Sequence, residues 1–136
     1  KYLLDNPLYA KSINISPRSA LNFWEAVNFL ESIADQSKRI ARDLHKAKSS
    51  QEQKKELREI FKIVEKHYKE TMTSFYKKDR QKALALANKK KGLLQTVDRF
   101  FLKHIHTPYL PNVSDKLKIL ILDIHNIARI AYVGSH

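Results

Sequence analysis

The chain has 136 residues with only two glycines, four prolines and no cysteine, a composition that excludes disulfides and thiolate metal sites. No apolar run reaches the roughly 18 unbroken residues that a membrane-spanning helix needs. Lys and Arg outnumber Asp and Glu by 26 to 14, and this net charge of +12 favours acidic partners such as phosphate, nucleic acid or an anionic membrane surface. A basic surplus is also typical of a well-solvated surface, so the charge alone identifies no partner.

The sequence predicts an all-α fold, an antiparallel bundle of four long helices. Between Arg18 and Thr107 the chain has no proline and one glycine, and Ala, Leu, Lys, Glu, Gln and Arg fill this stretch. We expect helices over residues 17–48, 50–78, 79–106 and 113–133. The connections between them are short, which favours antiparallel neighbours.

The first predicted helix follows a connector that is punctuated by Asn6-Pro7 and Ser16-Pro17. Residues 1–16 are interpreted as a helix end plus this connector, with Ser16 as the N-cap and Pro17 at the first helical position. The apolar stripe of the helix follows the 3.6-residue period and comprises Leu21, Trp24, Val27, Leu30, Ala34, Ser37, Ala41 and Leu44, with Phe23, Ile33 and Ile40 widening it.

Three further caps mark the starts of the later helices. Ser50 and Gln53 form a plausible capping box, Asp79 is expected to cap the third helix, and Ser114 the fourth. The fourth helix has one face made of Leu117, Leu120, Ile124, Ile127 and Ala131. It is apolar on most other sides as well, which is typical of a helix buried between others or lying in an interface.

Glu31 and Asp35 are the most distinctive polar pair, because a spacing of four residues stacks both carboxylates on one side of a helix. Their mutual repulsion costs roughly 0.2–0.5 kcal/mol, and a bound cation would reverse it. Paired carboxylates in helix bundles are how such proteins hold hard or borderline metals. The competing interpretation is that each pairs with a nearby base, for example Asp35 with Lys38 or Arg39.

Nothing else in the sequence forms a catalytic arrangement. Asp98, Asp123 and His125 lie on the third and fourth helices without a clear ligand spacing, and His-Glu-x-x-His and Gly-rich phosphate motifs are absent. We therefore predict that the chain is not an enzyme. The clusters Lys54-Lys55, Lys77-Lys78 and Lys89-Lys91 are expected on solvent faces, since the aromatic residues lie mostly on the apolar stripes rather than among the lysines.

The stretch 30–41 resembles the signature of PhoU domains, which reads L-E-R-I-G/A-D-H-A followed by x-N-I-A. The positions that match are Leu30, Glu31, Ile33, Ala34, Asp35, Ile40 and Ala41. Those that differ are Ser32, Gln36, Ser37 and Arg39. The connector around Asn6-Pro7 and residues 15–18 is similar to that of archaeal PhoU-like regulators, in which an AbrB-type DNA-binding domain often precedes the PhoU repeats.

The resemblance implies a cytoplasmic regulator of phosphate uptake that docks on phosphate transporters or sensor kinases. It also implies three-helix repeats, with residues 1–48 as the C-terminal part of a first repeat and 49–133 as a second. Residues 134–136 would be a tag remnant. Of the family's ligands for iron, zinc or other divalent metals, Glu31, Asp35 and Asp98 carry over, whereas Ile121 and His125 stand where Glu and Asp would be.

Two further hypotheses stay open, a helical nucleic-acid-binding domain and a carboxylate-bridged metal protein with some enzymatic activity that uses Glu31 and Asp35. The basic charge allows a helical nucleic-acid-binding domain, and DNA could also be reached through an upstream domain. The chain starts at Lys1, so we interpret it as a fragment whose first repeat is incomplete. The flank of helix 17–48 would then be uncovered, and we predict that a second copy buries it in a homodimer.

Overall fold

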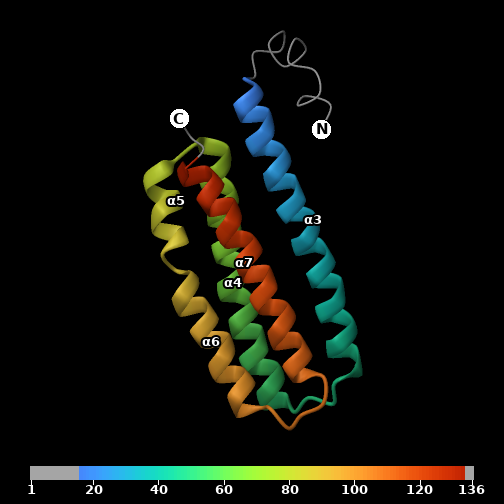
Figure 1. The fold of residues 1–136 in the computed structure, drawn as a ribbon. Coiled ribbons are helices and arrows are strands. Elements are labelled where there is room, and N and C mark those ends of the chain that lie inside the picture. The colour runs from blue at the N-terminus through green and yellow to red at the C-terminus, as the bar shows by residue number, and fades with distance from the viewer. Residues whose placement is uncertain (1–15, 134–136) are drawn as a thin grey trace.

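The computed structural model describes residues 16–133, and this part of the chain is an all-α bundle without strands, as predicted (Figure 1). Its helices are α3 (Pro17–Lys46), α4 (Gln51–Lys77), α5 (Arg80–Ala87), α6 (Lys90–Lys103) and α7 (Leu110–Val133). In these residues no helix has the length and hydropathy needed to cross a bilayer. The interpretations of residues 1–15 and 134–136 lie outside the described range.

Three of the predicted caps are present. The Ser16 hydroxyl accepts a hydrogen bond from the Ser19 amide at 3.1 Å, and the Asp79 carboxylate accepts one from the Lys82 amide at 3.1 Å. Ser50 and Gln53 form both arms of a capping box, at 3.1 and 2.8 Å. These side chains satisfy amides that the first helical turn leaves without partners, so local sequence alone fixes the starts of α3, α4 and α5.

The predicted single helix over 79–106 is wrong, because the chain breaks between α5 and α6 at Asn88 and Lys89. Asn is a poor helix former. At the end of α5 the Asn88 amide donates to the Leu84 carbonyl, the last bond of the α-helical pattern, and the Lys89 amide donates to the Leu86 carbonyl, only three residues earlier. The His125 ring hydrogen-bonds the backbone of Ala87, which provides a tertiary partner at the break.

Ser114 is not the cap of the last helix, which begins four residues earlier, at Leu110. Tyr109 precedes the helix in the left-handed region, with φ 71°, and its carbonyl accepts from the Val113 amide. Pro111 fits within the first turn because the amide that proline lacks has no partner there in any helix. Ser114 is consequently buried inside α7.

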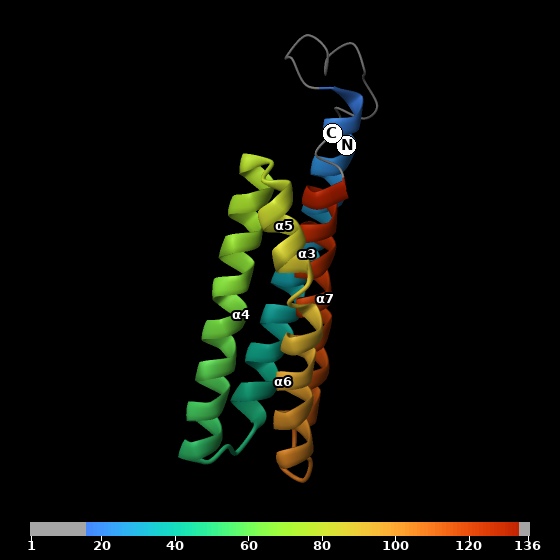
Figure 2. The same cartoon turned by 90° about the vertical axis from the view of Figure 1, so that its left-hand side faces the viewer.

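Helix α7 is the centre of the molecule and packs against α3, α4, α5 and α6 (Figures 1 and 2). In Figure 1 α3 lies on one side of α7 and α6 on the other. All five residues of the predicted α7 stripe are buried, namely Leu117, Leu120, Ile124, Ile127 and Ala131. The prediction that this helix lies between others is confirmed.

The predicted stripe of α3 coincides only in part with the face that packs on α7: Ile40 is buried, and Ile33 and Leu44 pack against the core. The buried side of α3 includes Ala26, Ile40 and two polar residues, Gln36 and Asp43. Ala34, Ser37 and Ala41 of the predicted stripe are exposed. Periodicity identified an apolar face correctly, but the structure covers only part of this face and leaves Ala34, Ser37 and Ala41 exposed.

Candidate functional site

Glu31 and Asp35 lie on α3, and both are exposed. The Asp35 carboxylate pairs with the Arg39 guanidinium one turn later, at 3.3 Å, with more than half of each side chain exposed. This is the competing interpretation that the spacing allowed. An exposed pair of this kind contributes at most about 1 kcal/mol to stability.

Asp98, the third residue of the predicted metal set, lies on α6, and its carboxylate accepts from the Lys118 ammonium at 2.8 Å. Helices α3 and α6 lie on different sides of α7, so the structure does not bring Asp98 to Glu31 and Asp35 (Figure 1). Across residues 16–133 no three His, Asp or Glu side chains form a group suited to a metal. Divalent-metal or iron binding therefore stays a prediction.

An apolar groove of about 630 Å³ lies between α3 and α4, with α7 as its floor. We call it the α3–α4 groove. Its α3 wall is Leu30, Ile33, Ala34, Ser37 and Ile40, its α4 wall is Phe61, Val64, Glu65 and Tyr68, and its floor is Leu117 and Leu120. Glu65 is its only ionisable carboxylate, so the groove has the composition of a protein-binding surface rather than of a polar ligand site.

The groove exists because α3 and α4 each pack on α7 while making little contact with one another. The four residues that join the two helices, 47–50, connect them only at one end of the bundle (Figure 1). Above this hairpin, Phe61 and Tyr68 remain only partly buried beside the core. Because α3 and α4 contact different sides of α7, a gap remains between them, and the groove lies in this gap.

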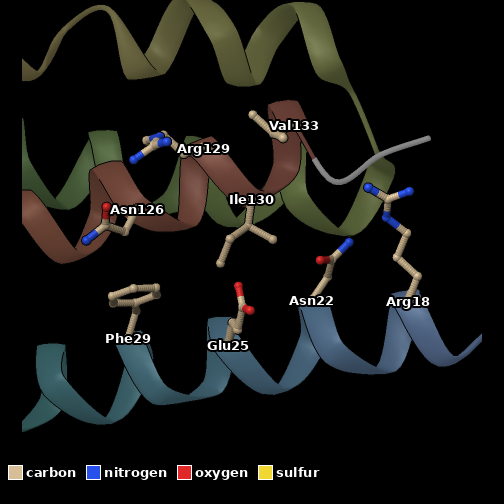
Figure 3. A pocket seen from close by; sticks show the side chains of 8 residues that line it. All are labelled: Arg18, Asn22, Glu25, Phe29, Asn126, Arg129, Ile130 and Val133. Atoms are coloured by element: carbon tan, nitrogen blue, oxygen red, sulfur yellow. The ribbon is translucent and has the colours of Figure 1, made fainter. Parts of the chain in front are cut away.

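A second, smaller cleft of about 290 Å³ lies between α3 and the C-terminal half of α7 (Figure 3). Arg18 and Glu25 extend from α3 and Arg129 from α7, with Phe29 and Ile130 as apolar walls. In Figure 3 the Glu25 side chain points toward Ile130, between the two helices. Charges of both signs line this cleft, so it has no clear preference for an anion or a cation.

The lysine clusters do not form one surface. Lys54 and Lys55 lie in the first turns of α4, and Lys77 and Lys78 lie at its other end, which is about 36 Å away at the helical rise per residue. All of the cluster lysines except the partly buried Lys90 are exposed, as predicted. A continuous basic platform of the kind that tracks a nucleic-acid backbone is not assembled along α4.

Two histidines, His67 of α4 and His125 of α7, lie near the lysines of the α5–α6 break. His67 of α4 is 4% exposed, and neither ring nitrogen has a partner among the described residues. Burial and the nearby Lys89 ammonium lower the pKa of His67, and burial and Lys90 lower the pKa of His125. Sequence analysis did not single out His67, because nothing local distinguishes it from a solvated histidine.

These two histidines make stability depend on pH. Their folded-state pKa values are below the unfolded value of about 6.5, so the unfolded chain binds more protons in acid. We expect the free energy of unfolding to fall as the pH is lowered below about 6.5. Replacing His67 with Leu should reduce this loss in urea titrations across that range, whereas replacing exposed His106 with Leu should not. Equal pH profiles for the two variants would contradict the assignment.

Two buried carboxylates connect α3 to α7, and the sequence alone did not predict these contacts. Asp43 of α3 pairs with Lys116 of α7, and Asp123 of α7 accepts a hydrogen bond from the Ser32 hydroxyl of α3. Burial raises the pKa of Asp123, against the effect of that hydrogen bond. These contacts fix the position of α3 along α7 and therefore shape the α3–α4 groove.

Comparisons with family models, curated proteins and solved structures gave no match for this chain.

Proposed function

We propose that this chain is a regulatory domain that acts by binding a helix of another polypeptide in the α3–α4 groove. The groove is the observation that supports this proposal, because a solvent-facing apolar hollow of about 630 Å³ has the size and composition of a docking site. Its walls are two helices, and the shape that fills the space between two neighbouring helices is a third helix.

The resemblance of residues 30–41 to the PhoU signature suggests where such a domain operates. On the basis of this resemblance, we propose that the chain is a PhoU-like regulator of phosphate uptake that contacts transporter or sensor-kinase components in the cytoplasm. Leu30 and Ala34 of the matched stretch line the groove, so the residues that carry the resemblance also form the proposed docking wall. Metal binding by Glu31 and Asp35 would be a separate property of the outer side of the same helix.

The absence of cysteine makes groove occupancy directly measurable. A polarity-sensitive fluorophore on Ser37→Cys would report from the groove, and one on Lys66→Cys would report from a position on α4 where the lysine side chain is 80% exposed. We expect the Ser37 label to shift to an apolar emission in the protein alone at micromolar concentration, or on adding a phosphate-transporter ATPase or a sensor-kinase domain. The Lys66 label should not shift.

A Ser37 label that stays in a water-like environment under all of these conditions would contradict the proposed function. Circular dichroism of both labelled variants would confirm that the fold is unchanged, since both positions are exposed.

A further inference from the structure

The exposed face of α3 has the repeat of a coiled-coil seam. Spacings of four and three residues alternate along Phe23, Val27, Leu30, Ala34, Ser37, Ala41 and Leu44. This is a 3.5-residue repeat, which keeps one apolar seam facing a partner helix. The face that packs on α7 uses other residues, including Ala20, Ala26 and Asp43, so α3 has one buried face and one seam that is only partly covered.

Helix α4 carries a matching face on the other wall of the groove. Phe61, Glu65, Tyr68, Met72 and Phe75 follow the same alternation of four and three residues. The four apolar members are only partly buried within this chain. A helix that lies between α3 and α4 would therefore meet a regular seam on both sides.

We propose that the occupant of the α3–α4 groove is α3 of a second copy of this chain, running antiparallel to the first across a two-fold axis. The α3–α4 hairpins of the two copies then form a four-helix bundle. This inference rests on the proposed function, because it names the partner of the same groove. In a two-fold interface the same surface is both ligand and site, and α3 meets that condition since its seam is also a groove wall. The small side chains of Ala34, Ser37 and Ala41 allow the two α3 helices to approach closely.

Charges beside the seam select the antiparallel arrangement. Glu31 and Lys38 are exposed on the same edge of the α3 seam, seven residues apart, on either side of Ala34. Within residues 16–133 neither takes part in an ion pair, in contrast to Asp35 and Arg39. Two α3 helices that cross antiparallel near Ala34 place each Glu31 within about one turn of Lys38 of the other copy, the edge-to-edge pairing of coiled coils.

A parallel pairing would lack these ion pairs. It would place the two copies of this edge on opposite sides of the interface, so Glu31 of one copy could not meet Lys38 of the other. The two antiparallel ion pairs lie at the solvent-exposed rim, so they specify orientation and the apolar seam supplies most of the affinity.

The solution mass of the protein, measured by analytical ultracentrifugation at micromolar concentration, tests this inference. We expect a dimer, and we expect Ala34→Glu to convert it to a monomer by introducing a charge into the seam. Glu31→Lys and Lys38→Glu should each weaken the dimer by about tenfold or more. The double variant Glu31→Lys/Lys38→Glu should restore the dimer, because it exchanges the charges without removing them. Lys66→Glu, outside the seam, should leave the mass unchanged.

The alternative outcomes are distinct. A monomer whose Ser37 label becomes buried on adding a transporter or kinase component would overturn the second-copy occupant and leave the proposed function intact. A monomer whose Ser37 label is buried without any other chain would overturn both, since another segment of the same chain would then fill the groove. A dimer that neither Ala34→Glu nor the single charge reversals weaken would overturn the second-copy occupant of the groove. All substituted positions are exposed, and the charge-restored double variant keeps the test decisive if Ala34→Glu fails to fold.

Discussion

Replacing Ile124 with Ala is expected to reduce the free energy of unfolding by about 3–4 kcal/mol, because it removes a fully buried aliphatic side chain from the helix that all the others contact. Urea denaturation followed by circular dichroism measures this loss. Ile119→Ala on the same helix is the matched control, since Ile119 is 42% exposed and should lose less than about 1 kcal/mol. Equal losses for the two variants would contradict the central position of α7.

Replacing Lys116 with Met is expected to reduce the free energy of unfolding by about 3 kcal/mol, because it leaves the carboxylate of Asp43 buried without its cation. The side chain of Asp43 is only 10% exposed, which makes its pair different in kind from the surface pairs. Lys62→Met provides the control, since its pair with Glu59 is largely exposed on both sides and should contribute less than about 1 kcal/mol.

A double variant separates the ion pair from the packing around it. Adding Asp43→Leu to Lys116→Met should recover most of the lost stability, because no charge then remains buried without a partner. Failure of the second substitution to recover any stability would show that the ion pair does not account for the loss. Both measurements concern the α3–α7 contact that holds the α3–α4 groove open.

Features set by neighbouring residues could be predicted from the sequence. The caps at Ser16, Ser50 and Asp79 depend on side chains within three residues of the amides that they bind, and all three are present. The buried stripe of α7 could be predicted because that helix is apolar enough for periodicity to identify its core face. The α5–α6 break could not be predicted in this way, since His125, which contacts the backbone of Ala87 at the break, lies 38 residues further along the chain.

The candidate site shows the same limit. Periodicity found the apolar stripe of α3 but could not say whether this chain or another one covers it. The structure shows that α7 packs on a neighbouring face of α3. This face contains Gln36 and Asp43, polar residues that are not expected to be buried. Asp43 can be buried because Lys116 neutralises its carboxylate, and Lys116 lies 73 residues away in the sequence. Local sequence therefore does not reveal the pair. A groove between helices depends on such distant pairs, so it becomes visible only in the fold.

The central claim is that another polypeptide covers the α3–α4 groove, and the emission of a polarity-sensitive label on Ser37→Cys tests it most directly. The account predicts an apolar emission at micromolar protein that reverts to a water-like emission on dilution, as the second copy dissociates, while the Lys66→Cys label stays water-like throughout. A Ser37 label that is water-like at every concentration, and remains so with the transporter and kinase components present, would contradict it.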